Sequence, residues 1–307
     1  MNIENDITMA DIVKGLYDLG LKKGDVVLVH AAMRTFGNIQ GGAQTVVDAF
    51  LDVIGPQGTL VVPTFTFKHE AEDDPVIDPQ NDISEMGAIS EAVRVHPKAL
   101  RSTAFRHSVA AIGRRAEVIT QCDSKLSPFD LHSSFGVMLA LNTKVLLAGV
   151  TYASSTSHHF AEWVCDVPYR HAFGVNVTVR NPDGSMVKQQ MTDYQPKPCA
   201  DGSVYGAKQH HTDFNFLGQM LEDKKQAVVS SIGNAVIRCF KMRDLVDTAQ
   251  VEAEKDFNVF RTDGSRGNDF TPLEIGQIVV SKEMPDGAGR PSSYQWSVVD
   301  ETLLKQP

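Results

Sequence analysis

The sequence has 307 residues, of which 42% are hydrophobic and 22% are charged, a composition typical of a folded protein with a sizeable core and not of a disordered chain. Its formal net charge is −9, whereas nucleic-acid-binding domains usually carry a basic face, so no nucleic-acid partner is expected. No run of about 18 apolar residues is present, and the sequence therefore predicts neither a membrane-spanning helix nor a membrane partner.

The amino-terminal segment and the cysteines bear on the cellular compartment. The first sixteen residues are acidic and then amphipathic, without the basic and apolar regions of a signal peptide. The cysteines lie far apart and form no CxxC pair, which argues against a zinc ribbon or a redox motif. We therefore expect free thiols and a cytoplasmic location.

Helical and strand patterns alternate along the first part of the chain, as they do in α/β folds. Residues 8–19 place apolar side chains at helical spacing, with Thr8 as a candidate N-cap. A short β-branched run at 25–30 predicts a buried strand. A second helix is expected at 43–54 and a second strand at 59–63.

The rest of the chain has a less regular pattern. It predicts, in order, a surface loop at 68–82, a helix at 86–95, strands at 107–113 and 144–150, and a helix at 156–166. A hairpin of 175–180 and 185–190 follows, then a strand within 227–240, a helix that begins at Gly233, and one strand at 277–281.

The segment 154–162, SSTSHHFAE, carries the most informative pattern. It follows a predicted buried strand, and ligand sites in α/β sheets lie beyond the carboxyl ends of strands. On a helix, His159 and Glu162 are three residues apart and share a face. A carboxylate there would hold the imidazole in the tautomer that leaves one nitrogen free to accept a proton. The alternative is a helix histidine without a catalytic task.

A metal site is a second interpretation of the same histidines. His158, His159 and Glu162 would be ligands, and His210, His211 or Asp213 would complete the shell. Spacings of this kind are common by chance, and the distant histidine pair follows no known ligand pattern. We therefore predict no metal.

Residues 30–42, HAAMRTFGNIQGG, form the second informative stretch. Small residues and glycines between a strand and a helix offer backbone N–H groups to a phosphate or a carbonyl. The stretch matches neither GxGxxG nor GxxxxGK[ST], so a Rossmann dinucleotide site and a P-loop are not supported. An ordinary strand-to-helix connection would look the same.

Further short segments stand in a fixed order along the chain. They include LGLKKGDVVLVH at 19–30, GGAQTVVDAF at 41–50, GTLVVPTFT at 58–66, MGAISE at 86–91, RS at 101–102, HSVAAIG at 107–113, SPFD at 127–130, VLLAGV at 145–150, TSHHFAE at 156–162, IGNA at 232–235 and RDLVD at 243–247. Together they resemble the aminoglycoside 3-N-acetyltransferase (antibiotic N-acetyltransferase) family over about residues 10–250.

The resemblance implies an enzyme that uses acetyl-CoA to acetylate an amine. It implies a three-layer α/β/α fold with a mixed central sheet, unrelated to the GNAT fold. We expect this domain to span residues 1–254. The remaining residues, 255–307, have no family counterpart that we can place, and we expect them to form a C-terminal extension packed on the domain.

The resemblance also implies site residues. The family histidine regarded as the base corresponds to His159, with Glu162 beside it. Contacts with CoA are implied for the strand-end histidine segment and for three later motifs, which correspond to His30, Ala31, Ala32, Met33, Arg34, Phe36, Met86, Arg101, Ser108 and Val109. The chain departs from the family in reading His-Ala-Ala where two serines often follow the histidine, and in lacking the histidine and proline that often follow Arg101-Ser102.

These expectations combine into one mechanism. A neutral His159, oriented by Glu162, would take a proton from the amine as its nitrogen attacks the thioester. Backbone N–H groups or a hydroxyl, Thr64 or Ser108, would stabilise the oxyanion.

The acceptor that the resemblance implies is an aminoglycoside or a related amino sugar. The alternatives are a biosynthetic acyltransferase on a different amine and a non-catalytic CoA-binding relative; a homodimer is also possible.

Overall fold

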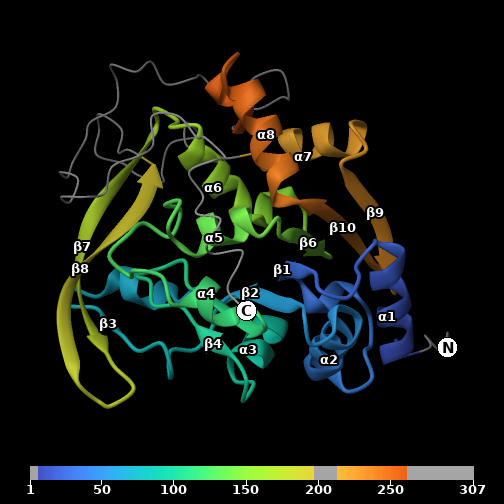
Figure 1. Cartoon of the computed structure of the whole chain (residues 1–307), viewed down its shortest axis with the longest axis horizontal. Helices are drawn as coiled ribbons and strands as arrows, with labels where there is room; N and C mark the ends of the chain where they lie inside the picture. The colour runs from blue at the N-terminus through green and yellow to red at the C-terminus, as the bar shows by residue number, and fades with distance from the viewer. Residues whose placement is uncertain (1–5, 197–212, 261–307) are drawn as a thin grey trace.

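The computed structural model describes residues 6–196 and 213–260, and Figure 1 shows their arrangement. The strands are β1 (Val26–Ala31), β2 (Thr59–Pro63), β3 (Val76–Ile77), β4 (Leu100–Arg101), β5 (Val109–Gly113), β6 (Lys144–Ala148), β7 (Arg170–Arg180), β8 (Met186–Pro196), β9 (Ala227–Ile232) and β10 (Ala235–Lys241).

The α-helices are α1 (Met9–Asp18), α2 (Gly42–Ile54), α3 (Ala88–Arg94), α4 (Ala116–Thr120), α5 (Ser134–Ala140), α6 (Thr156–Val164), α7 (Phe214–Asp223) and α8 (Met242–Ala253). Short 3₁₀ turns are η1 (Met33–Thr35), η2 (Phe67–Ala71), η3 (Tyr152–Ser154) and η5 (Phe257–Phe260). No helix among the described residues is both long and apolar enough to cross a bilayer.

A seven-stranded sheet within the described residues has the order β4-β5-β2-β1-β6-β10-β9. Strand β1 pairs in parallel with β2 and β6, while the outer pairs are antiparallel, so the sheet is mixed. The predicted strands of the first half are therefore present, and the mixed sheet is confirmed.

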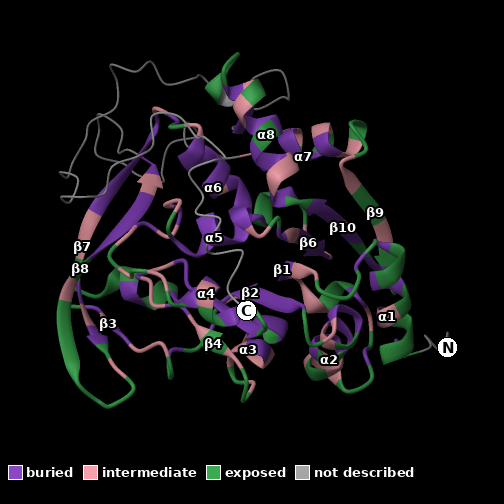
Figure 2. Cartoon of the chain, viewed as in Figure 1, coloured by how far each residue is buried: buried purple, intermediate pink, exposed green. Residues whose placement is uncertain are grey.

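Alternation along these strands divides the apolar side chains between two cores. In β1, Val27 and Val29 face a core shared with α1, α2 and α3, whereas Leu28 faces a core shared with α4 to α8. Figure 2 shows both interiors as buried layers, and Figure 1 shows α1 to α3 and α5 to α8 on opposite sides of the sheet. The predicted α/β/α three-layer fold is thus confirmed.

A second sheet, β3-β7-β8, stands beside the main one. Its hairpin has eleven-residue strands, much longer than the segments predicted from alternation. The missed part begins at Arg170, where the first four residues are all buried and no alternation appears. Buried strands of this kind lack the period-2 signal, so their length could not be predicted. The buried end of the hairpin meets the site described below.

One predicted helix is wrong. Gly233 and Asn234 form the turn between β9 and β10, and Gly233 adopts a φ of +57° in place of a helical value. Two-residue hairpins favour such positive φ values, so the glycine marks a hairpin and not a helix start. Helix α8 begins only at Met242. Helices α4, α5 and α7 were not predicted, and the strand predicted at 277–281 lies outside the described residues.

The topology gathers the predicted site at one edge of the sheet. The parallel strands β1, β2 and β6 all end there, and Pro63 at the end of β2 pairs with Val109 at the start of antiparallel β5. Helix α6 starts eight residues beyond β6. Segments from residue 30 to residue 160 therefore meet at this edge, where α/β proteins place their ligands.

Candidate active site

His159 lies near the start of α6, where its ring pairs with a buried carboxylate. Its Nδ1 is 2.7 Å from Glu162 Oε2, as the spacing of three on a helix predicts. The Glu162 side chain is fully buried, whereas that of His159 is 24% exposed. The predicted pair is therefore present, with the carboxylate sealed beneath the imidazole.

Two further residues hold the Glu162 carboxylate. The Tyr169 hydroxyl donates to Oε1 at 3.0 Å, and Arg170 Nε lies 2.8 Å from Oε2. Burial opposes ionisation of Glu162, but Arg170 and the hydrogen bonds from His159 and Tyr169 outweigh it and lower the pKa of this carboxyl. Glu162 is therefore ionised, accepts the Nδ1 proton of His159 and fixes its tautomer.

The environment of His159 favours the neutral imidazole. Burial, followed by the positive charge of Arg170, lowers the pKa of His159 below its ordinary 6.5, although Glu162 acts in the opposite direction. Nε2 makes no hydrogen bond with any described residue. A neutral ring with Nδ1–H bound to a carboxylate presents the Nε2 lone pair, as a general base requires.

Aromatic rings surround the imidazole of His159. Phe214 lies edge-on with its centroid at 4.9 Å, Phe129 is at 6.1 Å, and the ring of His107 is at 6.4 Å. These aromatic rings reduce the access of water to the pair of His159 and Glu162 and strengthen the electrostatic interaction within it. They come from α7, from the loop before α5, and from the residue two positions before β5.

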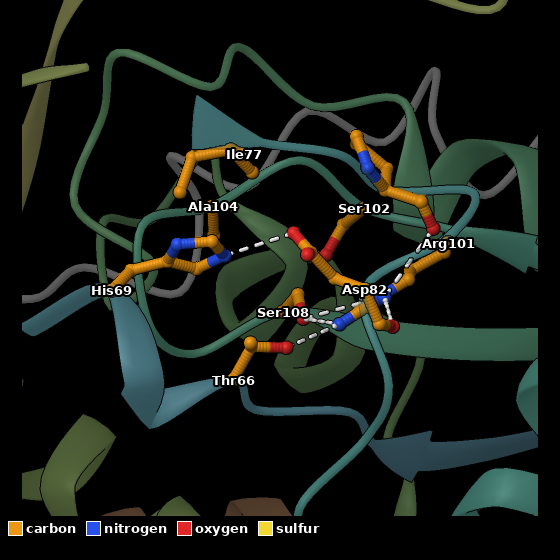
Figure 3. A pocket seen from close by; sticks show the side chains of 9 residues that line it. Thr66, His69, Ile77, Asp82, Arg101, Ser102, Ala104 and Ser108 are labelled. Atoms are coloured by element: carbon orange, nitrogen blue, oxygen red, sulfur yellow. Dashed lines mark hydrogen bonds and ion pairs between the residues drawn. The ribbon is translucent and has the colours of Figure 1, made fainter. Parts of the chain in front are cut away.

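The predicted residues Thr64, Arg101 and Ser108 form one hydrogen-bonded group at the end of β2. Figure 3 shows Arg101 and Ser108 of this group, with Thr66 and Asp82 beside them. Arg101 Nε donates to Thr64 Oγ1 at 3.1 Å, and Ser108 Oγ donates to the Thr64 carbonyl at 2.8 Å. Arg101 also donates to the Asp82 carbonyl at 2.5 Å and to Thr66 Oγ1 at 3.0 Å. Burial lowers the pKa of Arg101 to about 10, which leaves it charged at neutral pH.

A small cavity adjoins this group. It is lined by Thr66, His69, Asp82, Arg101, Ser108 and four neighbours, and its volume of about 10 Å³ suits a single water. His69 lies between two carboxylates, with Nε2 at 2.9 Å from Asp82 and Nδ1 at 2.8 Å from Glu72. These bonds link His69, Glu72 and Asp82 within the segment 68–82, which is predicted as a surface loop.

The predicted CoA contacts fall into two groups. Those at the end of β1 and directly after it are accessible: Ala31, Ala32 and Met33 are half-buried, and Arg34 is exposed. Met86 is half-buried as well. The others lie deeper, because His30, Phe36 and Val109 are buried and Arg101 and Ser108 belong to the group around Thr64. All of them surround the same sheet edge.

Sequence reasoning missed Tyr169 and Arg170. Both follow α6 in the chain and reach back to Glu162 from the start of β7, in a stretch with no recognised pattern. The only available signal was a charged residue inside an apolar run, since a buried arginine requires a partner. His107 was quoted as part of a motif, but its proximity to His159 was not predicted.

The metal interpretation finds no support among the described residues. His158 is fully buried, with Phe214 stacked on its ring at 4.8 Å, and neither ring nitrogen has a partner there. Asp213 caps α7 by accepting from the Asn215 amide at 3.0 Å. No three potential ligands come together in the described part of the chain, while His210 and His211 lie outside it.

Comparisons with known proteins identify the family of this chain. The family described as Aminoglycoside 3-N-acetyltransferase matches residues 28–252. Aminoglycoside N(3)-acetyltransferase IV of Salmonella sp is 28% identical over 255 residues, which cover 82% of this chain and 89% of that protein.

Solved structures share the fold. Aminoglycoside acetyltransferase AAC(3)-Xa matches with a TM-score of 0.71 and 25% identity, covering 84% of this chain and 95% of that chain. AAC-IIIb in binary complex with CoASH matches with a TM-score of 0.69 and 22% identity, covering 81% of this chain and 96% of that chain, and has the same fold. The resemblance inferred from the ordered motifs is confirmed: this chain is an acetyltransferase that belongs to the aminoglycoside 3-N-acetyltransferase family.

Proposed function

We propose that this enzyme transfers the acetyl group of acetyl-CoA to an amine of an aminoglycoside or related amino sugar, with His159 as the general base. One observation carries the proposal: a fully buried, ionised Glu162 lies 2.7 Å from Nδ1 of a partly exposed imidazole. That arrangement leaves Nε2 free to accept a proton, which is what acylation of an amine demands.

The chemistry follows from the basicity of amines. An aliphatic amine is mostly protonated at neutral pH, and it attacks a thioester only as the neutral form. As its nitrogen bonds to the thioester carbon, Nε2 of His159 takes the departing N–H proton. The resulting imidazolium is stabilised by Glu162, which stays ionised. Collapse of the tetrahedral intermediate breaks the carbon–sulfur bond, and the CoA thiolate recovers the proton from His159.

The residues after β1 suit the pantetheine and phosphates of CoA. Ala31 and Ala32 are small and half-buried, so a narrow chain could pass close to the sheet edge above them. The exposed Arg34 offers a guanidinium for a phosphate group. His30 lies beneath, with Nε2 buried and without a partner among the described residues. These features support acetyl-CoA as the donor.

Charges on the hairpin side bear on the acceptor. Arg106 forms ion pairs with Glu70 at 2.9 Å and with Asp193 at 3.6 Å. Arg106 also acts electrostatically on His159, which places this cluster near the base. Carboxylates attract the cationic amines of aminoglycosides, but here Arg106 offsets one of the two negative charges. This observation favours, as a second candidate, a biosynthetic acceptor with fewer positive charges.

The proposal is tested by thiol release from acetyl-CoA. The enzyme is mixed with acetyl-CoA and a panel of aminoglycosides, nucleotide-linked amino sugars and simple amines, and free CoA is measured against a blank without acceptor. We expect acceptor-dependent release and an acetylated product of the matching mass. If the release of free CoA never exceeds that of the blank, the proposed activity is refuted and a non-catalytic CoA-binding relative is the remaining interpretation. A preference for singly charged amines would select the biosynthetic alternative.

A further inference from the structure

His107 lies beside the proposed base, in a position with no assigned role. Its ring packs against Phe65 with centroids 4.8 Å apart and against Phe129 at 4.9 Å. The ring of His159 is 6.4 Å away and touches the same Phe129. Two imidazoles therefore flank one aromatic wall, and their ring centres are 6.4 Å apart.

The two nitrogens of His107 differ in what they can reach. Nδ1 is sealed in the interior and makes no hydrogen bond with any described residue. The residue as a whole keeps 9% of its surface accessible. Nε2 is therefore the ring nitrogen of His107 that is able to meet a ligand.

The same surroundings determine the protonation of His107. Burial, and then the positive charge of Arg106, lower the pKa of this histidine well below its ordinary value, so the ring is neutral. A neutral imidazole carries one N–H and one bare nitrogen. Since unpaired N–H groups are rarer in protein interiors than unpaired acceptors, the bare nitrogen belongs at the sealed Nδ1. The hydrogen then sits on Nε2.

We propose that His107 is a catalytic hydrogen-bond donor, whose Nε2–H stabilises the oxyanion formed when the amine attacks the acetyl thioester. This inference rests on the function proposed above. As the carbon–nitrogen bond forms, the carbonyl π electrons move onto oxygen, and His107 donates a hydrogen bond to that oxygen while keeping its proton. His159 takes the amine proton on the other side of the reacting carbon. The oxygen becomes a carbonyl again when the thiolate leaves.

The hydroxyls predicted for this role are already engaged. Ser108 Oγ donates its hydrogen to the Thr64 carbonyl at 2.8 Å. Thr64 is fully buried, and its Oγ1 lies 3.1 Å from Ser108 Oγ and accepts from Arg101. Neither hydroxyl can turn to a substrate oxygen without breaking this group, whereas Nε2 of His107 makes no hydrogen bond with a residue that the structure describes. Thr64 and Ser108 are better suited to fixing the backbone that carries His107.

Two replacements of His107 separate chemistry from packing. His107→Phe keeps the ring shape between Phe65 and Phe129 but removes the donor, and His107→Gln restores an N–H. His132→Phe, at an exposed position outside the site, is the matched control. Each full-length protein is assayed with acetyl-CoA and the best acceptor of the panel, and its melting temperature is recorded.

We expect His107→Phe to fold normally and to lower kcat about 10²–10³-fold with little change in the KM for acetyl-CoA, the usual effect of losing one oxyanion donor. His107→Gln should recover at least about tenfold over the Phe variant. The control should match the wild type. Unchanged kcat in His107→Phe, a rise in KM alone, or a Phe variant that fails to fold would each overturn the inference.

A binding measurement tests the same claim without an acceptor. Trifluoroacetonyl-CoA presents tetrahedral oxygens at its hydrated ketone, and CoASH lacks them. Calorimetry should show His107→Phe binding the analogue about two- to tenfold more weakly, with the affinity for CoASH unchanged, because one neutral hydrogen bond is lost. Equal losses of affinity for the analogue and for CoASH, or no loss of affinity for either, would contradict the inference. A His159 variant that retains turnover would instead refute the proposed function. That result is independent of the measurements on His107→Phe, so the two proposals can fail separately.

Discussion

Arg170 and Glu162 form a buried ion pair, with Nε and Oε2 2.8 Å apart and side-chain exposures of 8% and 0%. The pair supports the carboxylate in its charged form at the point where it contacts His159. Because Arg170 starts β7 and Glu162 lies on α6, the contact also joins the hairpin to the three-layer domain. The orientation of the base therefore depends on the docking of the second sheet.

Replacing Glu162 by Gln tests this dependence. The substitution keeps the shape of the side chain but breaks the buried ion pair with Arg170, a change that typically costs about 3–5 kcal/mol of the free energy of unfolding. Urea titrations of the wild type and the variant measure it. Asp18→Asn breaks the exposed Lys14–Asp18 pair and should cause no measurable loss. Similar small losses in both variants would show that the buried pair is not structural.

The pH dependence of turnover reports the protonation of His159. Its pKa is lowered below 6.5 by burial and by Arg170, so the base is lost only as pH falls through a value below 6.5. Profiles of kcat/KM should be recorded with two acceptors whose amines differ in pKa. The limb of the profile that reports the amine should shift in pH between the two acceptors. The limb that reports His159 should keep the same pH with both. A fixed limb above pH 7 would contradict this assignment.

Stability should fall as the pH is lowered from neutrality. Burial lowers the pKa of His30 to about 4 and that of His158 to about 3, both from an ordinary 6.5. As the pH falls below 6.5, these histidines therefore bind protons in the unfolded chain before they do so in the folded protein. Each of them lowers the free energy of unfolding by up to about 1.4 kcal/mol per pH unit in that range. Melting temperatures at pH 7.5, 6.5 and 5.5 measure the slope.

His158→Leu should flatten that slope. The ring nitrogens have no partner in the described part of the chain, and the ring lies among Tyr152, Phe214 and Phe240, so a leucine suits the site. Removing unpaired buried nitrogens should also raise stability at pH 7.5. His132→Leu serves as the exposed control. If His158→Leu and the wild type lose stability equally between pH 6.5 and 5.5, His158 is not buried in its neutral form.

Gly149 tests the packing at the end of β6. Its φ is +69°, and a Cβ there would strike the Thr35 hydroxyl, which belongs to η1 beside the proposed CoA contacts. Gly184 has a φ of +83° but open space around it, so alanine there carries the backbone strain alone. We expect Gly149→Ala to lower the melting temperature more than Gly184→Ala and to raise the KM for acetyl-CoA. Equal effects would mean that the close approach is unimportant.

The sequence predicted those parts of the site that depend on local spacing. His159 and Glu162 share a helix face three residues apart, and that spacing fixes their contact whatever surrounds the helix. The strands that carry residues 25–30 and 59–63 have short apolar runs with clear turn signals, so their positions were predictable.

The parts of the site that the sequence does not predict depend on contacts between distant segments. Arg170 and Tyr169 reach Glu162 only because the hairpin docks on α6, and His107 meets His159 only through the sheet order β5-β2-β1-β6. Gly233 was interpreted as a helix start although the following asparagine makes a typical hairpin turn. Such features need the sheet topology, which a single sequence does not provide.

The central claim is that Nε2 of His159 removes the proton of the attacking amine. The most direct measurement is single-turnover acetyl transfer by His159→Gln, with enzyme in excess over acetyl-CoA and folding verified by its melting temperature. We predict a rate about 10²–10⁴-fold below that of the wild type, with the affinity for CoASH retained. A His159→Gln enzyme that transfers the acetyl group at the wild-type rate would contradict the account.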